Sequence, residues 1–182
     1  AALLAVVFGA GGFMATVDWP QMLNGAICLP AAALGWVLFL RRPGRLVYAA
    51  AAGVATGFSI LAGHHSAPVA ILCAVAGLTG YALYERRWTP ARLRCYAAGL
   101  AVFGVFFFLA GAAQTLPAME YWRVSYRFVN AKEPVTFDQQ IPYAVHRHYS
   151  LNAASLPGLV VNGFHREAAL NPFLGATVTA LA

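Results

Sequence analysis

Residues 41–66 read RRPGRLVYAAAAGVATGFSILAGHHS, an uncharged apolar run between an arginine-rich turn and a short polar turn without Lys or Arg. A helix that crosses a bilayer takes about 20 apolar residues, and the run at 46–62 approaches that length. Comparable runs occupy 1–16, 21–40, 67–84 and 95–114, and another begins within 172–182. The sequence therefore predicts an all-α, polytopic bundle of transmembrane helices.

Composition supports the membrane class. The chain is 60% hydrophobic and 10% charged, whereas soluble domains carry about 25% charged residues. The net charge of +6 could suggest a polyanion partner. Most of the basic residues, however, fall in the two clusters 41–45 and 85–94, which are typical topology signals, so nucleic acid is not expected as a partner. The three cysteines lie in or beside apolar runs and indicate neither a zinc site nor a disulfide framework.

The arginine clusters alternate with turns that lack basic residues. Cytoplasmic loops are enriched in Lys and Arg, so 41–45 and 85–94 are predicted to be cytoplasmic. The turns 17–20 and 63–66 and the long segment 115–171 then lie on the extracytoplasmic side. This divides the chain into a helical part, 1–114, an external loop module, 115–171, and the start of a further helix.

Small residues and prolines predict how the helices pack. Gly53 and Gly57 lie four residues apart, so they share a face and allow close backbone approach. Further glycines are expected to leave positions without a side chain in the later helices, where a neighbour can approach closely: Gly77, Gly80, Gly99 and Gly104. Pro30 lies inside the run 21–40 and is expected to kink that helix.

The polar turn at 63–66 contains two consecutive histidines. Gly63 suits a helix C-cap, Ser66 an N-cap and Pro68 the first turn of the following helix. The pattern places His64 and His65 in a tight external hairpin.

The segment 115–171 is predicted to be an ordered, partly helical module, because it is rich in aromatic residues. If Pro117 begins a helix, Glu120, Arg123 and Arg127 share one face. Two arginines one turn apart can hold a phosphate or diphosphate. The alternative is an interfacial helix whose arginines extend to the membrane surface or pair with Glu120.

Other external residues could contact a substrate. His64, His65 and His146 lie on the same predicted side and suit hydrogen bonding to substrate. No carboxylate stands at a recognised metal-site spacing from them, so no metal ligands are assigned, although a divalent cation stays open as a cofactor. Asp18 is a candidate general base, but an aspartate at a helix end is more often a cap.

Several strings resemble those of bacterial YfhO-type membrane proteins. Residues 61–68, LAGHHSAP, are similar to that family's "sGHpq" turn, with Ser66 where a Gln is common. Residues 113–120, AQTLPAME, followed by Ser125-Tyr126-Arg127, look like its "QllP..E...S.R" junction. Three later strings resemble its external loop and next helix, in the same order: Tyr149-Ser150, Ser155-Leu156-Pro157-Gly158 and Asn171-Pro172-Phe173-Leu174-Gly175.

That family belongs to the multi-spanning GT-C glycosyltransferases. The resemblance implies sugar transfer from a polyprenyl-phosphate-linked donor to an envelope glycan or glycopolymer, on the outer face of the bacterial cytoplasmic membrane. It also implies a longer parent chain whose catalytic acid lies upstream of residue 1. We therefore expect this chain to be an internal piece that is inactive alone, embedded among membrane lipids.

Two other function classes stay open. A transporter or flippase for lipid-linked or anionic cargo would place ionisable residues and broken helices near the middle of the bilayer. The predicted runs contain almost no charge, which favours chemistry at the surface over a crossing pathway. A structural membrane subunit without catalysis is the third reading.

Overall fold

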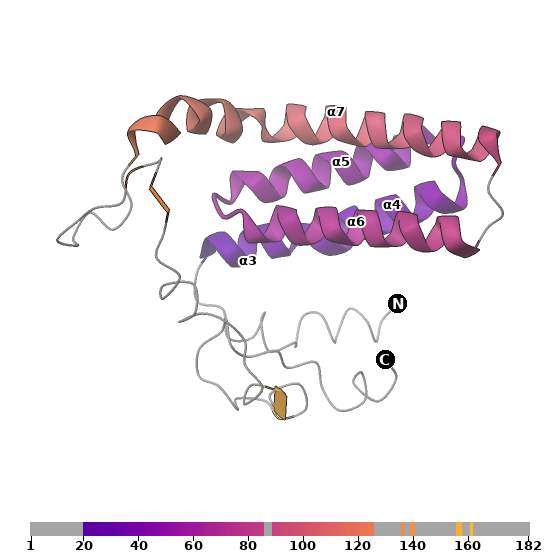
Figure 1. Cartoon of the computed structure of the whole chain (residues 1–182), viewed down its shortest axis with the longest axis horizontal. Helices are drawn as coiled ribbons and strands as arrows, with labels where there is room; N and C mark the ends of the chain where they lie inside the picture. The colour runs from indigo at the N-terminus through magenta and orange to yellow at the C-terminus, as the bar shows by residue number, and fades with distance from the viewer. Residues whose placement is uncertain are drawn as a thin grey trace. The chain divides into compact units, whose positions relative to one another are not determined.

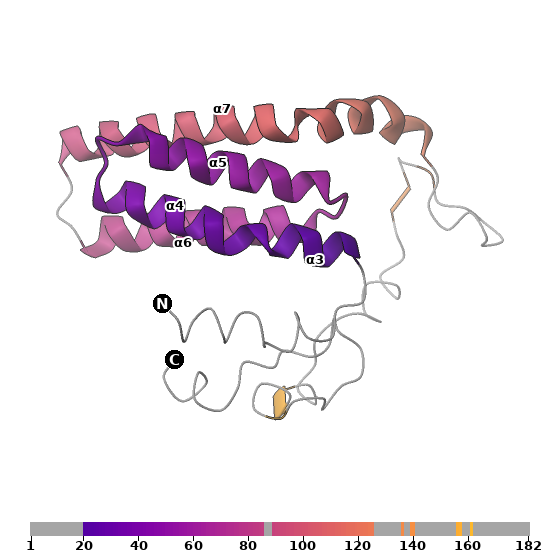
Figure 2. The same ribbon diagram turned by 180° about the vertical axis from the view of Figure 1, so that it is seen from behind.

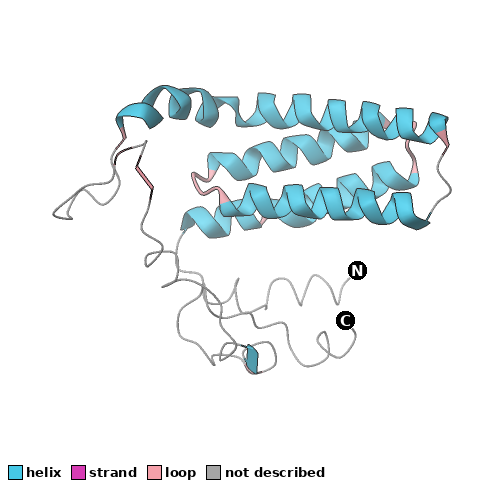
Figure 3. Ribbon diagram, viewed as in Figure 1, coloured by secondary structure: helices cyan, strands magenta, loops and turns pink. Residues whose placement is uncertain are grey.

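A computed structural model describes residues 20–85 and 89–125, together with Thr136, Gln139, Gln140, Leu156, Pro157 and Val161. The runs 1–16 and 172–182 lie outside the described residues, as does most of the module 115–171. Residues 20–122 form one compact unit. The described chain is all-helical and contains no strand (Figure 3).

The first two described helices run in the same direction, and each later α-helix runs antiparallel to the one before it (Figure 1). The helices are α3 Pro20–Ala26, α4 Cys28–Arg41, α5 Leu46–Leu61, α6 Ser66–Glu85, α7 Pro90–Tyr121 and the short 3-10 helix η1 Trp122–Val124. Three segments are long and apolar enough to cross a membrane, namely Pro20–Arg41, Ser66–Glu85 and Pro90–Tyr121. The chain is therefore a membrane protein.

The charged residues of the described helices lie near the two ends of this bundle, where the turns between the helices are found (Figures 1 and 2). The turn between α4 and α5 and the start of α7 lie at one end, here named the arginine end, with Arg41, Arg42, Arg45, Arg92 and Arg94. The turn between α5 and α6 and the last turn of α7 lie at the other, here named the histidine end, with His64, His65 and Glu120.

Helix α5 is the packing centre of the bundle. It has 16 residues, which at 1.5 Å per residue span about 24 Å, less than the hydrocarbon core of about 30 Å. All of its buried residues are small: Ala49, Ala52, Gly53, Thr56, Gly57 and Ser59. A helix with such a face can be approached closely by neighbours on two sides, here α7 and α4.

The predicted close approach at Gly53 and Gly57 is confirmed. A Cβ added at Gly57 would lie 2.5 Å from the Cβ of Ala110 and 2.7 Å from the carbonyl oxygen of Phe107. A Cβ at Gly53 would collide with the carbonyl oxygen of Phe103. The backbones of α5 and α7 are therefore in direct contact.

A neighbouring helix uses one of the other four glycines. Gly99 accommodates the ring of Phe39 from α4, which would overlap an added Cβ. Among the described residues, no atom lies within 4 Å of a Cβ added at Gly77, Gly80 or Gly104. The sequence shows where a helix lacks a bulky side chain, but it does not show whether a neighbouring helix packs there.

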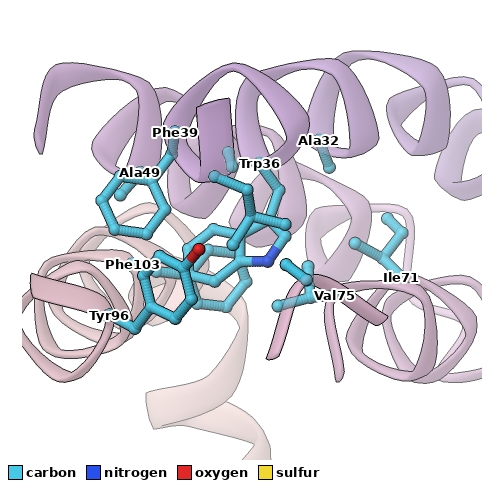
Figure 4. Close-up of a cluster of buried hydrophobic side chains, with 11 residues drawn as sticks. Ala32, Trp36, Phe39, Ala49, Ile71, Val75, Tyr96 and Phe103 are labelled. Atoms are coloured by element: carbon cyan, nitrogen blue, oxygen red, sulfur yellow. The ribbon is translucent and has the colours of Figure 1, made fainter. Parts of the chain in front are cut away.

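Aromatic rings fill the space between α4 and α7 (Figure 4). Trp36 is fully buried, with its ring centroid 4.9 Å from that of Phe39 and 5.4 Å from that of Phe103. Its indole Nε1–H donates to Thr79 Oγ1 of α6 at 2.9 Å. The Thr79 hydroxyl donates in turn to the Val75 carbonyl at 2.7 Å, so α6 is fixed to α4 by a satisfied polar contact.

The two prolines act differently. The expected break near Pro30 is present, because α3 ends at Ala26 and α4 begins at Cys28. The Pro30 ring excludes the helical hydrogen bond to the Ala26 carbonyl. Pro117 does not begin a helix, which was the condition for Glu120, Arg123 and Arg127 to share one face: it lies inside α7, which continues to Tyr121. α7 bends toward its C-terminal end (Figures 1 and 2), as a helix-interior proline requires.

We predict that Gly53→Ala destabilises the bundle by about 1–3 kcal/mol, because the new methyl group meets the rigid backbone of α7. Gly104→Ala is the matched control, since it makes the same change in an open part of a helix. It should alter stability by less than about 1 kcal/mol, in the stabilising direction. The free energy of unfolding in detergent measures both effects, and equal effects would contradict the proposed α5–α7 contact.

Candidate functional site

The histidine end is organised by a sharp turn after α5. Gly63 has φ +78°, a left-handed conformation that favours glycine. Its amide donates to the Ile60 carbonyl at 2.9 Å. The prediction that Gly63 caps the helix is therefore confirmed, and the chain reverses direction within a few residues before α6 begins.

His64 caps the next helix. Its Nδ1 lies 2.7 Å from Ser66 Oγ and accepts the Ser66 amide at 3.3 Å. α6 already begins at Ser66, so the prediction of Ser66 as the N-cap residue is wrong and the imidazole supplies the capping acceptor. Because Nδ1 accepts the amide proton, Nε2 carries the ring proton in this arrangement.

His65 lies against His64. The two rings are stacked, with centroids 5.0 Å apart and planes 9° from parallel. Partial burial, and secondarily the charge of His65, lower the pKa of His64 below its ordinary value. A neutral His64 is what the capping role requires, since only an unprotonated Nδ1 accepts hydrogen bonds.

The hairpin rests on α3. A Cβ added at Gly25 would lie 2.8 Å from the Cβ of Ala67 and 3.4 Å from the Ser59 carbonyl oxygen. Pro68, in the first turn of α6, is buried. The hairpin between α5 and α6 is therefore packed against α3, while His65 itself is exposed.

The end of α7 brings a carboxylate to the same end of the bundle. Glu120 is exposed in the last α-helical turn. α7 ends at Tyr121 and is followed by η1, so the α-helix that carries Glu120 stops before Arg123. The backbone of Arg123 lies in η1, whereas its side chain is outside the described part of the chain.

Several predicted site residues are not described. Asp18, Arg127 and His146 lie outside the described residues, so the structure neither joins them to the histidine hairpin nor separates them from it. Within the described ranges no group of three or more His, Cys, Asp or Glu side chains could hold a metal ion. Of the predicted site residues, the structure thus describes the side chains of His64, His65 and Glu120.

These groups can form hydrogen bonds to a polar ligand at a membrane surface. The capping geometry uses Nδ1 of His64 as an acceptor, so its ring proton is on Nε2. Sequence reasoning located both histidines but missed the capping role. The spacing His-x-Ser before an apolar helix was the available signal, since the ring of a residue two positions before a first turn can reach its amides.

No family model matches the chain, and neither a curated protein nor a solved structure is significantly similar to it. Functional argument therefore depends on the geometry of the histidine end and on the strings that resemble YfhO-type proteins.

We predict that His65→Gln raises the pKa of His64, because it removes one of the two causes that lower it. His65→Phe should raise it as well, since a phenyl ring keeps the stacking without the charge. Two-dimensional ¹H–¹⁵N NMR of the imidazole nitrogens measures the titration. An unchanged or lower pKa in both variants would contradict an electrostatic effect of His65.

The same shift predicts how the hairpin responds to pH. The folded hairpin binds fewer protons than the open chain near the ordinary pKa of about 6.5, so its stability rises with pH there. We expect the neutral His64 cap to stabilise the hairpin fully above that pH. This stabilisation should be lost as the pH falls through the lowered pKa of His64. Hydrogen exchange of the Ser66 amide as a function of pH measures this stabilisation. Weaker protection of the amide at high pH than at low pH, after correction for intrinsic exchange, would contradict the prediction.

Proposed function

We propose that this chain is part of an integral membrane glycosyltransferase of the GT-C type, which uses a polyprenyl-phosphate-linked sugar donor at the histidine end. The acceptor would be an envelope glycan or glycopolymer. The histidine end would face the extracytoplasmic side of the bacterial cytoplasmic membrane, and the arginine end the cytoplasm, as the distribution of basic residues favours.

One observation carries this proposal. The two strings that most resemble the YfhO-type family, 61–68 and 113–120, are separated by a whole helical hairpin in sequence, yet both lie at the histidine end of the bundle (Figures 1 and 2). Residues that serve one reaction must meet at one membrane surface. That the hairpin histidines and Glu120 lie toward the same end of the described bundle supports the proposal.

The residues would have different roles. Neutral His64 and its neighbour His65 would donate or accept hydrogen bonds at sugar hydroxyls, and Glu120 would contact the donor or acceptor. Arg123 and Arg127, which follow α7, would bind the donor phosphate by charge-assisted hydrogen bonds. The catalytic acid would come from the parent chain upstream, with Asp18 a weaker candidate.

The orientation can be tested first. We predict that a membrane-impermeant maleimide added to intact cells labels His65→Cys and leaves Arg45→Cys unlabelled until the membrane is opened. Both variants are made in the parent protein with its native cysteines replaced by serine. Labelling of Arg45→Cys alone in intact cells would reverse the orientation and place the site in the cytoplasm.

The phosphate role has its own test in the parent protein. We predict that Arg123→Ala or Arg127→Ala raises the donor KM about 10-fold or more, because a charge-assisted hydrogen bond contributes about 1.5–3 kcal/mol. Arg94→Ala, at the opposite end of the bundle, is the control and should leave KM unchanged. Transfer of labelled sugar from a polyprenyl-phosphate donor in membrane vesicles provides the measurement. A normal donor KM in both variants would exclude phosphate binding by these arginines.

The same assay separates the proposal from the transporter alternative. A flippase moves the lipid-linked sugar across the bilayer without transferring it, so it would change the donor's accessibility and produce no glycosylated acceptor. The described spans carry their charged residues at their ends, whereas transport pathways place such residues near the middle of the bilayer. Glycosylated product is therefore the expected outcome.

A further inference from the structure

Helices α4 and α7 meet at the arginine end through two aromatic rings. The centroids of Phe39 and Tyr96 are 6.2 Å apart (Figure 4), and the Phe39 ring packs on Gly99. Both aromatic side chains are buried. The last turn of α4 and the first turns of α7 therefore form a closed seam at this end.

Three arginines of the α4–α5 turn and α7 lie beyond the Phe39–Tyr96 contact, toward the arginine end. The Arg42 amide donates to the Phe39 carbonyl at 3.0 Å, so Arg42 lies one turn past Phe39. Arg92 precedes Tyr96 by four residues and so shares its face of α7, one turn nearer the end. The Arg45 amide donates to the Arg42 carbonyl at 2.9 Å, which folds a third arginine back toward the first.

The charge at this end is strongly positive. Arg42 and Arg45 are exposed and Arg92 is half-buried, while the acidic side chain described at this end is Glu85, in the last turn of α6. Beneath the arginines, the Tyr96 hydroxyl is buried and has no hydrogen-bond partner, although buried polar groups usually have one. An anion at the membrane surface would complement this group of charges.

The bilayer itself supplies that anion. Basic clusters next to a transmembrane helix attract anionic headgroups, by about 1 kcal/mol for each Lys or Arg near the surface. Guanidinium groups can also bind phosphate through two parallel hydrogen bonds. A diffuse surface charge would depend only on the number of arginines near the membrane surface. Here Arg42 and Arg92 each lie about one turn beyond one of two rings that are in contact, which favours a defined site.

We propose that Arg42, Arg45 and Arg92 form a binding site for the phosphate of an anionic phospholipid in the leaflet at the arginine end. The bound headgroup links the α4–α5 turn to the start of α7. This site is independent of the proposed glycosyltransferase function, because it lies at the opposite end of the bundle and uses none of its residues.

Native mass spectrometry of the 182-residue chain, released from detergent micelles, tests the site with phosphatidylglycerol and phosphatidylcholine as probes. We expect Arg42→Gln and Arg92→Gln each to weaken phosphatidylglycerol binding about fivefold. Arg94→Gln is the matched control, because it removes the same charge from the same helix. Arg94 lies two residues from Arg92, on the opposite face of α7, and should change binding less than twofold.

Three results would overturn the proposal. An equal loss in Arg94→Gln would mean a diffuse charge effect, and equal binding of phosphatidylcholine would mean no selectivity for the anionic headgroup. Displacement of the lipid by millimolar inorganic phosphate would assign the site to a free anion. Circular dichroism confirms that each variant keeps its helical content, and Arg42→Gln, in the turn after α4, carries the test alone if Arg92→Gln loses helix.

Discussion

The contact between the small-residue face of α5 and the backbone of α7 is the constraint on which the rest of the bundle depends. In a membrane, helices gain little from hiding apolar side chains, because lipid is equally apolar, so close packing must hold them together. Gly53 and Gly57 leave no side chain between the two backbones. The opposite side of α5 receives α4 in a similar way, since a Cβ added at Gly35 would lie 3.1 Å from the Tyr48 carbonyl oxygen. One short helix thus sets the spacing of its two neighbours.

Function at either end follows from that spacing. α5 joins the arginine-rich turn to the histidine turn. Because α5 is packed between α4 and α7, the position of each turn relative to these two helices is also set. At the histidine end, the hairpin is packed on α3 and His64 caps α6. At the arginine end, Arg42 and Arg92 each lie about one turn beyond the Phe39–Tyr96 contact. Both proposals therefore depend on the same packing and concern opposite membrane surfaces.

Sequence reasoning predicted the membrane class, the apolar helices and the break caused by Pro30, because each follows from local composition or backbone chemistry. It also located the turn at Gly63, where a positive φ requires glycine. It failed where the role of a residue depends on the parts of the structure that surround it. Gly53 and Gly104 are indistinguishable as residues, yet only the first has a helix packed on it. Pro117 has the signature of a helix start, but the helix already formed by the preceding apolar run continues through it. The capping role of His64 depends on a ring orientation that no pattern contains.

The most direct test of the account is a site-directed spin-label scan along α7, which measures both its burial against α5 and its immersion in lipid. Labels at successive positions from 100 to 112 should show oxygen accessibility with a helical period. The minima should fall at Phe103, Phe107 and Gly111, and the maxima at exposed positions such as Val105 and Leu109. A water-soluble nickel chelate should be excluded throughout. A profile without helical period, or free access of the chelate at Val105 and Leu109, would contradict a transmembrane α7 packed on α5.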